Sequence, residues 1–200
     1  MKIGIFGGTF NPPHLAHLNI AEDFSRRLSF DKLIIIPTYQ PPHKQAQSLA
    51  DGEDRLEMCR LLFDAENTEI SDMEIRRQGK SYTYDTLCQL EEKYPEAELY
   101  LIIGSDMLLS FHKWYRYEDI LRKCTLCVLT RENDIDNAHM KAYAIEALGL
   151  GEGDIVFSSL EPTVLSSTRI REMVARGEDV SSLTGEKVWA YIKEKRLYNV

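Results

Sequence analysis

The sequence predicts an α/β fold, in which helices flank a Rossmann-like parallel sheet and a small helical portion lies at the C-terminal end. Apolar runs of strand length alternate along the chain with stretches of helical spacing. Several of these runs are continuously apolar, which is typical of strands buried on both faces of a parallel sheet. Two hundred residues suffice for one such domain. We therefore expect a single domain over residues 1–200, with 165–200 as its C-terminal helical portion.

The first half of the chain predicts alternating strands and helices. Lys2–Phe6 is a short apolar run that indicates a buried strand. Asn11 is a favoured N-cap and Pro12 suits the first helical position, so we expect a helix to begin there and to reach about Phe24. The next expected elements are a continuously apolar strand over Lys32–Pro37, a helix over Asp51–Phe63, and an alternating edge strand over Thr68–Ile75.

The second half continues the alternation. Ser81 is a favoured N-cap for a helix over Tyr82–Leu90, which Pro95 stops, and Leu99–Ile103 indicates the central strand. The remaining expected elements are a helix over Glu118–Arg122, a strand over Thr125–Leu129, a helix over Asn137–Leu148 closed by Gly149, a strand over Ile155–Phe157, a helix capped by Ser166 or Ser167, and a helix over Gly185–Lys195.

Charge and composition narrow the function classes. The formal net charge is −8, which argues against general nucleic-acid binding because that needs a basic surface. No apolar run approaches the ~20 residues of a membrane span, and no signal-peptide pattern opens the chain. We therefore expect no membrane partner and a cytoplasmic location, while homo-oligomerisation stays open. Residues 1–21, 32–50 and 163–171 contain no acid, so an anionic small ligand fits these stretches.

The four cysteines predict core thiols rather than a disulfide scaffold or a zinc site. They are Cys59, Cys88, Cys124 and Cys127. Four cysteines are too few to form a disulfide scaffold in a chain of this length. The C-x-x-C pair lies in or beside a strand, where residues three apart point to opposite faces, and no second pair completes a zinc site.

The turn between the first strand and the first helix is the strongest candidate site. Gly7 and Gly8 lack a Cβ, so a ligand can approach the backbone, and the helix N-terminus behind them presents amide hydrogens. This combination favours a phosphate. His14 and His17, three residues apart, share one face of the helix near its start. A metal site at this histidine pair lacks a convincing third ligand.

A second helix start, near the C-terminal end, also favours an anion. Arg169 and Arg171 lie in the first turns of a helix, where the helix dipole disfavours cations. An anionic ligand would resolve this conflict.

Gly79-Lys80-Ser81 resembles only the end of a P-loop. The full motif needs a glycine at position 74, where the chain has Glu74. The sequence therefore disfavours a Walker-type ATPase.

Other candidates follow the ends of expected elements, each with an alternative. Lys44 lies in a loop after a strand and is either a ligand contact or a solvated side chain. Asp106 could bind a ribose or a metal, or cap a helix, and Trp114 could stack on a flat ring or pack in the core. The first-turn amides around Thr83 and Tyr84 could hold a carboxylate.

Residues 7–17, GGTFNPPHLAH, resemble the GTFxPxHxGH signature of the HxGH nucleotidyltransferases. With IPTYQPPHK, SYTYDTL, GSD, KWY and LSSTRIR, the chain most resembles the bacterial nicotinate mononucleotide adenylyltransferases over nearly its whole length. Ala16 replaces the glycine of HxGH and adds a methyl group close to the phosphate path, and Asn11 stands where the family often has Asp.

The resemblance implies adenylyl transfer from ATP to nicotinate mononucleotide, which gives nicotinate adenine dinucleotide and pyrophosphate in NAD biosynthesis. The residues that it implies to be catalytic are His14, His17 and Arg171. Those implied to bind ATP are Gly7, Gly8, Thr9, Phe10, Lys44, Gly104, Asp106, Ser166, Ser167 and Thr168. Those implied to bind nicotinate mononucleotide are Thr83, Tyr84 and Trp114. Arg131 is added to them as a candidate phosphate contact, because the strand that ends at Leu129 delivers it to the same edge of the sheet.

The implied chemistry needs alignment and charge neutralisation more than a base. A phosphate nucleophile is already ionised at neutral pH, so no general base is required. Mg²⁺ would bridge the ATP oxygens and keep most of its ligands as water, so no dedicated carboxylate cluster is expected. Two alternatives remain: an adenylyltransferase acting on phosphopantetheine or nicotinamide mononucleotide, and a nucleotide sensor with the same fold and no catalytic activity.

Overall fold

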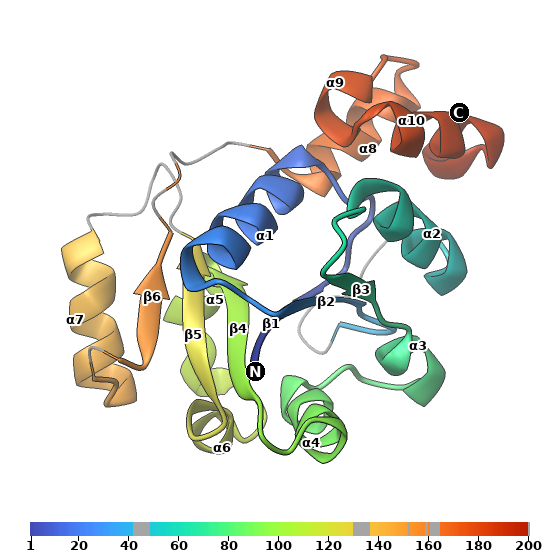
Figure 1. Ribbon diagram of the computed structural model, residues 1–200. Coiled ribbons are helices and arrows are strands. Elements are labelled where there is room, and N and C mark those ends of the chain that lie inside the picture. The colour runs from blue at the N-terminus through green and yellow to red at the C-terminus, as the bar shows by residue number, and fades with distance from the viewer. Residues whose placement is uncertain (42–48, 130–136, 152, 159, 161–164, 200) are drawn as a thin grey trace.

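A computed structural model describes the whole chain except residues 42–48, 130–136, 152, 159, 161–164 and 200. Its centre is a six-stranded parallel sheet in the order β3-β2-β1-β4-β5-β6 (Figure 1). The strands are β1 (Lys2–Gly8), β2 (Lys32–Pro37), β3 (Thr68–Ile70), β4 (Glu98–Gly104), β5 (Cys124–Leu129) and β6 (Ile155–Phe157). The predicted α/β fold with a Rossmann-like parallel sheet is therefore confirmed.

Helices lie on both faces of the sheet. They are α1 (Leu15–Leu28), α2 (Gly52–Leu62), α3 (Met73–Arg77), α4 (Thr83–Lys93), α5 (Ser105–Leu109), α6 (Tyr117–Leu121), α7 (Asn137–Leu148), α8 (Ser167–Ala175), α9 (Ser181–Thr184) and α10 (Glu186–Glu194), with 3₁₀ turns η1 (Phe111–Lys113) and η2 (Leu197–Asn199). None of those in the described part of the chain is long and apolar enough to cross a membrane.

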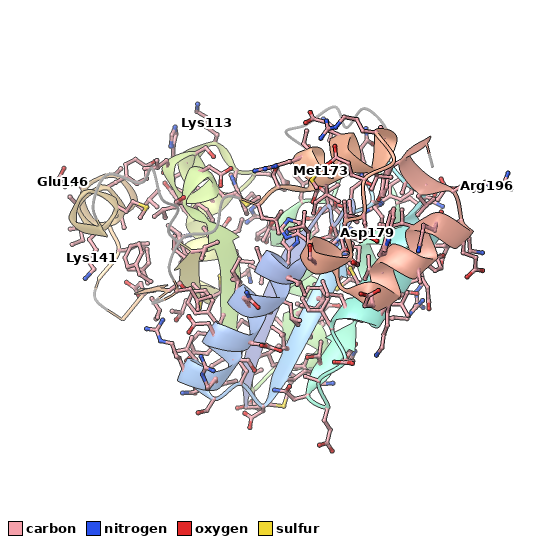
Figure 2. The ribbon with its side chains drawn as sticks, turned by 90° about the horizontal axis from the view of Figure 1, so that it is seen from above. Lys113, Lys141, Glu146, Met173, Asp179 and Arg196 are labelled. Atoms are coloured by element: carbon pink, nitrogen blue, oxygen red, sulfur yellow. The ribbon has the colours of Figure 1, made fainter. Side chains whose placement is uncertain are left out.

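The C-terminal helices form the predicted helical portion. α10 packs against α9 and α2, and α9 packs against α1. In the view from above (Figure 2), Lys141 and Glu146 mark α7 at one end of the molecule, and Arg196 marks the C-terminal helices at the other. In this view α7 and the end of the chain therefore lie on opposite sides of the molecule.

Side-chain alternation along the strands divides the apolar core into two layers. On β4, Ile102 packs into one layer, while its neighbours Leu101 and Ile103 pack into the other. Helices α1, α2, α8 and α10 close the first layer, and α4, α5, α6 and α7 close the second. Burial on both faces is the physical reason for the continuously apolar strand sequences.

The cysteines behave largely as predicted. All four are free thiols, and Cys124 and Cys127 belong to opposite layers of the core. Burial raises the pKa of the Cys124 thiol to about 12 and also raises those of Cys59 and Cys127. These three thiols therefore stay protonated at neutral pH. Cys88 on α4 is only half-buried, so it is not the core thiol that the sequence suggested.

The predicted start of the first helix is wrong by a few residues. α1 begins at Leu15 with His14 as its N-cap, not at Asn11. The side-chain oxygen of Asn11 instead accepts hydrogen bonds from the Ala50 amide at 3.1 Å and the Tyr198 hydroxyl at 2.8 Å. Because these partners occupy the oxygen, tertiary contacts override the local capping preference.

The predicted strand over 68–75 is wrong beyond Ile70. The Ser71 amide still donates to the Ile35 carbonyl at 2.9 Å, but Met73–Arg77 then forms α3. Glu74 is buried on this short helix, where its carboxylate accepts a hydrogen bond from Thr86.

The predicted N-cap of the next helix is also wrong. The N-cap of α4 is Tyr82 and not Ser81. The Ser81 hydroxyl instead accepts a hydrogen bond from the Tyr39 amide at 3.0 Å.

The strand order places a natural ligand site at one edge of the sheet. Connections run from β1 outward through β2 and β3, and then from β4 outward through β5 and β6. The order therefore reverses between β1 and β4, whose carboxyl ends lie at Gly8 and Gly104. Open parallel sheets bind ligands in the crevice outside such a reversal point.

Candidate active site

A cleft of about 680 Å³ lies outside the carboxyl ends of β1 and β4. Its lining comes mainly from the turn after β1 with the start of α1, the end of β4 with the start of α5, and the first turns of α8. The predicted catalytic and ATP-binding residues that line it are Gly7, Gly8, Thr9, Phe10, His14, His17, Gly104, Asp106, Ser166, Ser167, Thr168 and Arg171. The fold thus brings three segments distant in sequence to one space.

The two histidines form a stacked pair at the start of α1. Their ring centroids lie 3.7 Å apart with planes inclined by 25°. The His14 amide donates to Nδ1 of His17 at 3.2 Å. Since Nδ1 accepts a hydrogen bond, the ring proton of His17 lies on Nε2. We therefore infer that Nε2–H is the donor group of the His17 ring.

The two glycines of the turn have different structural roles. A Cβ placed on Gly7 would meet no atom of the described residues within 4 Å, and the residue lines the cleft. A Cβ on Gly8 would lie 3.0 Å from the ring of Phe10. That ring is 2% exposed and packs edge-on against His17, with centroids 5.1 Å apart. Gly7 therefore permits backbone approach, while Gly8 makes room for the ring that supports His17.

The first turns of α8 dock on the turn after β1. The Ser166 hydroxyl caps the helix by accepting from the Arg169 amide at 3.3 Å, and Ser167 donates to the Pro12 carbonyl at 2.8 Å. Arg171 donates to the Asn11 carbonyl at 2.8 Å and to the Thr168 hydroxyl at 3.3 Å. In the described part of the chain, Arg171 forms no ion pair with a carboxylate, so its charge is available to an anion at the cleft.

The cleft is poor in acids. Asp106, in the first turn of α5, is the one carboxylate among the described residues that line it. The N-terminal turns of α1 and α8 and the guanidinium of Arg171 contribute positive potential at the same place. A polyanion is therefore the ligand that the local electrostatics favour, although the whole chain is acidic.

Thr83, Tyr84 and Trp114, which were predicted to bind the acceptor nucleotide, are not among the residues that line this cleft. The Tyr84 ring packs against Tyr115, with centroids 6.1 Å apart, and the guanidinium of Arg116 lies 4.0 Å from its centre. Trp114 stacks on Phe111 at 4.7 Å, so that a ligand could stack only on its opposite face. Thr83 is the first residue of α4. Lys44 and Arg131 lie outside the described residues.

Sequence reasoning missed several polar side chains that support the site. Arg55 and Glu74 are buried, and the Tyr198 hydroxyl donates to the side chain of Asn11. The sequence held a signal for Arg55, because it lies at helical spacing from Met58 and Leu62, on the face of α2 that enters the core. A charged side chain on a buried helical face needs hydrogen-bond partners.

Comparison with known proteins decides the family. A family model described as cytidylyltransferase-like matches residues 5–173. A probable nicotinate-nucleotide adenylyltransferase of Listeria monocytogenes serotype 4a is 38% identical over 198 residues, which cover 98% of this chain and 97% of that protein. The chain belongs to the nicotinate-nucleotide adenylyltransferases of the cytidylyltransferase-like family. The resemblance seen in the sequence motifs is thereby confirmed.

Other relatives agree with this family. A probable nicotinate-nucleotide adenylyltransferase of Pelobacter propionicus is 38% identical over 213 residues and aligns with 100% of this chain and 99% of its own length. Nicotinic acid mononucleotide adenylyltransferase of Plasmodium falciparum, solved in complex with NaAD, has a TM-score of 0.79 at 17% identity and covers 99% of this chain and 97% of its own. At that identity, the solved structure supports the fold alone.

The open space beside Gly7 gives a test of the phosphate-binding turn in this family member. We expect Gly7→Ala to weaken ATP binding at least about tenfold, or ~1.4 kcal/mol, because its methyl group enters the cleft. Its unfolding free energy should change by less than about 1 kcal/mol, since the methyl group meets no atom in the part of the chain that the structure describes. Calorimetric titration and urea unfolding measure the two effects.

Gly4→Ala is the matched control on the same strand. Its Cβ would lie 2.4 Å from the Phe30 ring, inside the core, so we expect about 1–3 kcal/mol of destabilisation. ATP affinity of the folded protein should stay unchanged. Tight ATP binding by Gly7→Ala would contradict the assignment of Gly7 to the ligand path.

Glu74 lies beneath the segment that leads into α4. The Thr86 hydroxyl donates to its carboxylate at 2.6 Å and accepts from Arg77 at 3.0 Å, and Arg77 lies 3.9 Å from Glu74. Burial nevertheless raises the pKa of Glu74 above its ordinary value of 4.5. The cluster joins α3 to the start of α4, where the acceptor residues were predicted.

The raised pKa of Glu74 predicts a pH-dependent stability. As the pH rises above about 4.5, Glu74 ionises in the unfolded chain before it ionises in the folded protein. Ionisation therefore favours unfolding until the pH passes the pKa that Glu74 has in the folded protein. We expect the wild-type chain to lose stability over this window relative to Glu74→Gln, which cannot ionise. Urea unfolding of both proteins from pH 4 to 7 measures the difference. A difference that does not vary with pH would contradict the prediction.

Proposed function

We propose that this chain transfers the adenylyl group of ATP to nicotinate mononucleotide, giving nicotinate adenine dinucleotide and pyrophosphate in NAD biosynthesis. The observation that carries the proposal is the cleft, where His14, His17, Arg171 and the first turns of α1 and α8 surround one acid-poor space. Family membership supports the same activity, since relatives of almost equal length carry the name nicotinate-nucleotide adenylyltransferase.

The reaction is a displacement at phosphorus. A phosphate oxygen of nicotinate mononucleotide forms a bond to the α-phosphorus of ATP, and the bond from that phosphorus to the bridging oxygen of pyrophosphate breaks. The nucleophile needs no deprotonation, so the protein aligns two anions and neutralises charge on the leaving oxygens. His17 would do so through its Nε2–H and Arg171 through its guanidinium, while His14 orients His17 through its backbone amide.

We propose that Mg²⁺ enters as part of the Mg–ATP substrate. Among the described residues, no group of three or more His, Cys, Asp or Glu side chains could hold a metal ion. The ATP phosphates and water would therefore supply most of its ligands, as Mg²⁺ commonly prefers. Asp106 is the carboxylate in the described lining that could contact the ion or a ribose hydroxyl.

The acceptor would bind beside the start of α4. We propose that the amides of Thr83 and Tyr84 hold the nicotinate carboxylate, because an 11-residue helix begins there and its first amides attract an anion. Trp114 would stack on the pyridine ring with the face that Phe111 leaves uncovered. Contacts from Lys44 and Arg131 to phosphates, the cytoplasmic location and any homo-oligomer stay predictions.

Pyrophosphate release tests the proposal. The protein is incubated with Mg–ATP and, in parallel reactions, with nicotinate mononucleotide, nicotinamide mononucleotide or phosphopantetheine. We expect turnover that strongly favours nicotinate mononucleotide, with nicotinate adenine dinucleotide as the product. Turnover with another acceptor would move the activity to that substrate, and ATP binding without any turnover would favour the sensor alternative.

A further inference from the structure

Arg55 is a buried cation whose hydrogen bonds in the described part of the chain all go to main-chain oxygens. It lies in α2, is 1% exposed, and donates to the carbonyls of Ala50 at 2.9 Å, Thr9 at 2.9 Å and Thr38 at 2.6 Å. In the described part of the chain, it forms no ion pair with a carboxylate. Burial lowers its pKa, yet a guanidinium stays protonated in proteins.

The three carbonyls belong to the segments that frame the cleft. Thr9 is in the turn after β1 and lines the cleft, Thr38 follows the end of β2, and Ala50 precedes α2. The Ala50 amide also donates to the side chain of Asn11 at 3.1 Å. The turn is therefore fastened at both Thr9 and Asn11 to the residues that begin α2.

Core packing alone does not account for a cation at this position. An apolar side chain of similar size would avoid the desolvation cost of a buried charge, but it would leave three carbonyls without this donor, at about 1–3 kcal/mol for each buried group. A guanidinium differs in that its planar fork fixes several acceptors in one geometry. The guanidinium thus satisfies the three carbonyls and at the same time fixes their relative positions at the turn.

We propose that Arg55 is a positioning residue, which holds the turn from Gly7 to Asn11 against the ends of the 38–50 segment so that the histidines and turn amides stay aligned with the phosphates. The inference rests on the proposed function, because alignment is the main work of that reaction. Arg55 lies beneath the turn and is not among the residues that line the cleft. It acts through main-chain geometry and not through contact with substrate.

Two substitutions separate geometry from charge and from folding. Arg55→Lys keeps the charge and most of the apolar stem but lacks the fork, and Arg55→Met keeps the stem alone. Arg60→Lys is the matched control, since Arg60 lies on the same helix with a half-exposed side chain paired to Glu57. Urea unfolding first gives the folded fraction of each variant, and either Arg55 variant that folds suffices for the test.

Two readouts are then taken. We expect kcat of the folded Arg55 variants to fall about 10²-fold, the scale for a misplacement of ~1 Å, while KM for nicotinate mononucleotide changes less than about threefold, ~0.7 kcal/mol. Amide hydrogen exchange at Gly8–Asn11 should accelerate about tenfold or more, ~1.4 kcal/mol of local stability, and exchange in α7 should not change. Arg60→Lys should match the wild type in its kinetic constants and in its amide exchange.

Three outcomes would overturn the role of Arg55. They are wild-type kcat in a folded Arg55→Lys variant, a loss of kcat no larger than the loss of folded protein, and unchanged exchange at Gly8–Asn11. Absence of turnover in the wild-type protein would instead refute the proposed function. The exchange measurement needs no substrate, so it would still decide whether Arg55 holds the turn.

Discussion

Replacing His17 with alanine is expected to lower kcat by at least about a hundredfold, the range for removal of one preorganised donor to a transition state. The Nε2–H of His17 is fixed because Nδ1 accepts from the His14 amide and Phe10 packs edge-on against the ring. Alanine removes this donor from the cleft. ATP binding should weaken much less than kcat, since charge on the leaving oxygens develops only during the reaction.

Three companion measurements make this prediction specific to the His17 donor. His17→Gln retains an N–H donor and should recover part of the loss. Asn19→Ala, an exposed change on the same helix, should match the wild type. Urea unfolding should show that His17→Ala costs about 1 kcal/mol, the scale of a lost helix cap. Wild-type turnover by His17→Ala would refute the role of the histidine pair.

The sequence predicted the order of elements because that information is local. Strand-length apolar runs favour burial, and Pro95 and Gly149 end helices through their backbone preferences. These preferences do not depend on contacts with distant segments. Helix α7 and strand β6 accordingly begin and end at the predicted residues. The turn after β1 was also found from sequence, since its glycines and histidines form a contiguous motif and the fold places that motif at the reversal of strand order.

What could not be predicted depends on contacts between distant segments. Asn11 has the composition of a helix cap, but its oxygen accepts from Ala50 and from Tyr198, which is 187 residues away. The helical spacing of Arg55 from Met58 and Leu62 places it on the core face of α2, but it does not reveal that the carbonyls of Thr9 and Thr38 accept its hydrogen bonds. The short helix α3 interrupts an alternating pattern, because the buried carboxylate of Glu74 accepts a hydrogen bond from the Thr86 hydroxyl. In each case a tertiary hydrogen bond outweighs a local preference.

Arg171 connects the two anion-binding segments. It belongs to α8, yet it donates to the Asn11 carbonyl in the turn after β1, while its own helix supplies the Thr168 hydroxyl. A phosphate at the cleft would therefore meet a guanidinium already oriented by both segments. This preorganisation also explains how a cation persists in the second turn of a helix, where the dipole alone disfavours it.

We therefore expect Arg171→Ala to lower kcat/KM for ATP by about 10²–10³-fold, and Arg171→Lys to recover only a small part of the loss, because an ammonium lacks the planar fork. Unfolding free energy should fall by only about 1 kcal/mol, the scale of one hydrogen bond. Arg169→Ala is the matched control, since Arg169 is exposed on the same helix and does not line the cleft. Steady-state pyrophosphate release measures all three variants. If Arg171→Lys matched the wild type, a point charge would suffice and the oriented guanidinium fork would have no catalytic role. If Arg169→Ala lost as much activity as Arg171→Ala, the loss would be caused by the net charge of α8 and not by Arg171 itself.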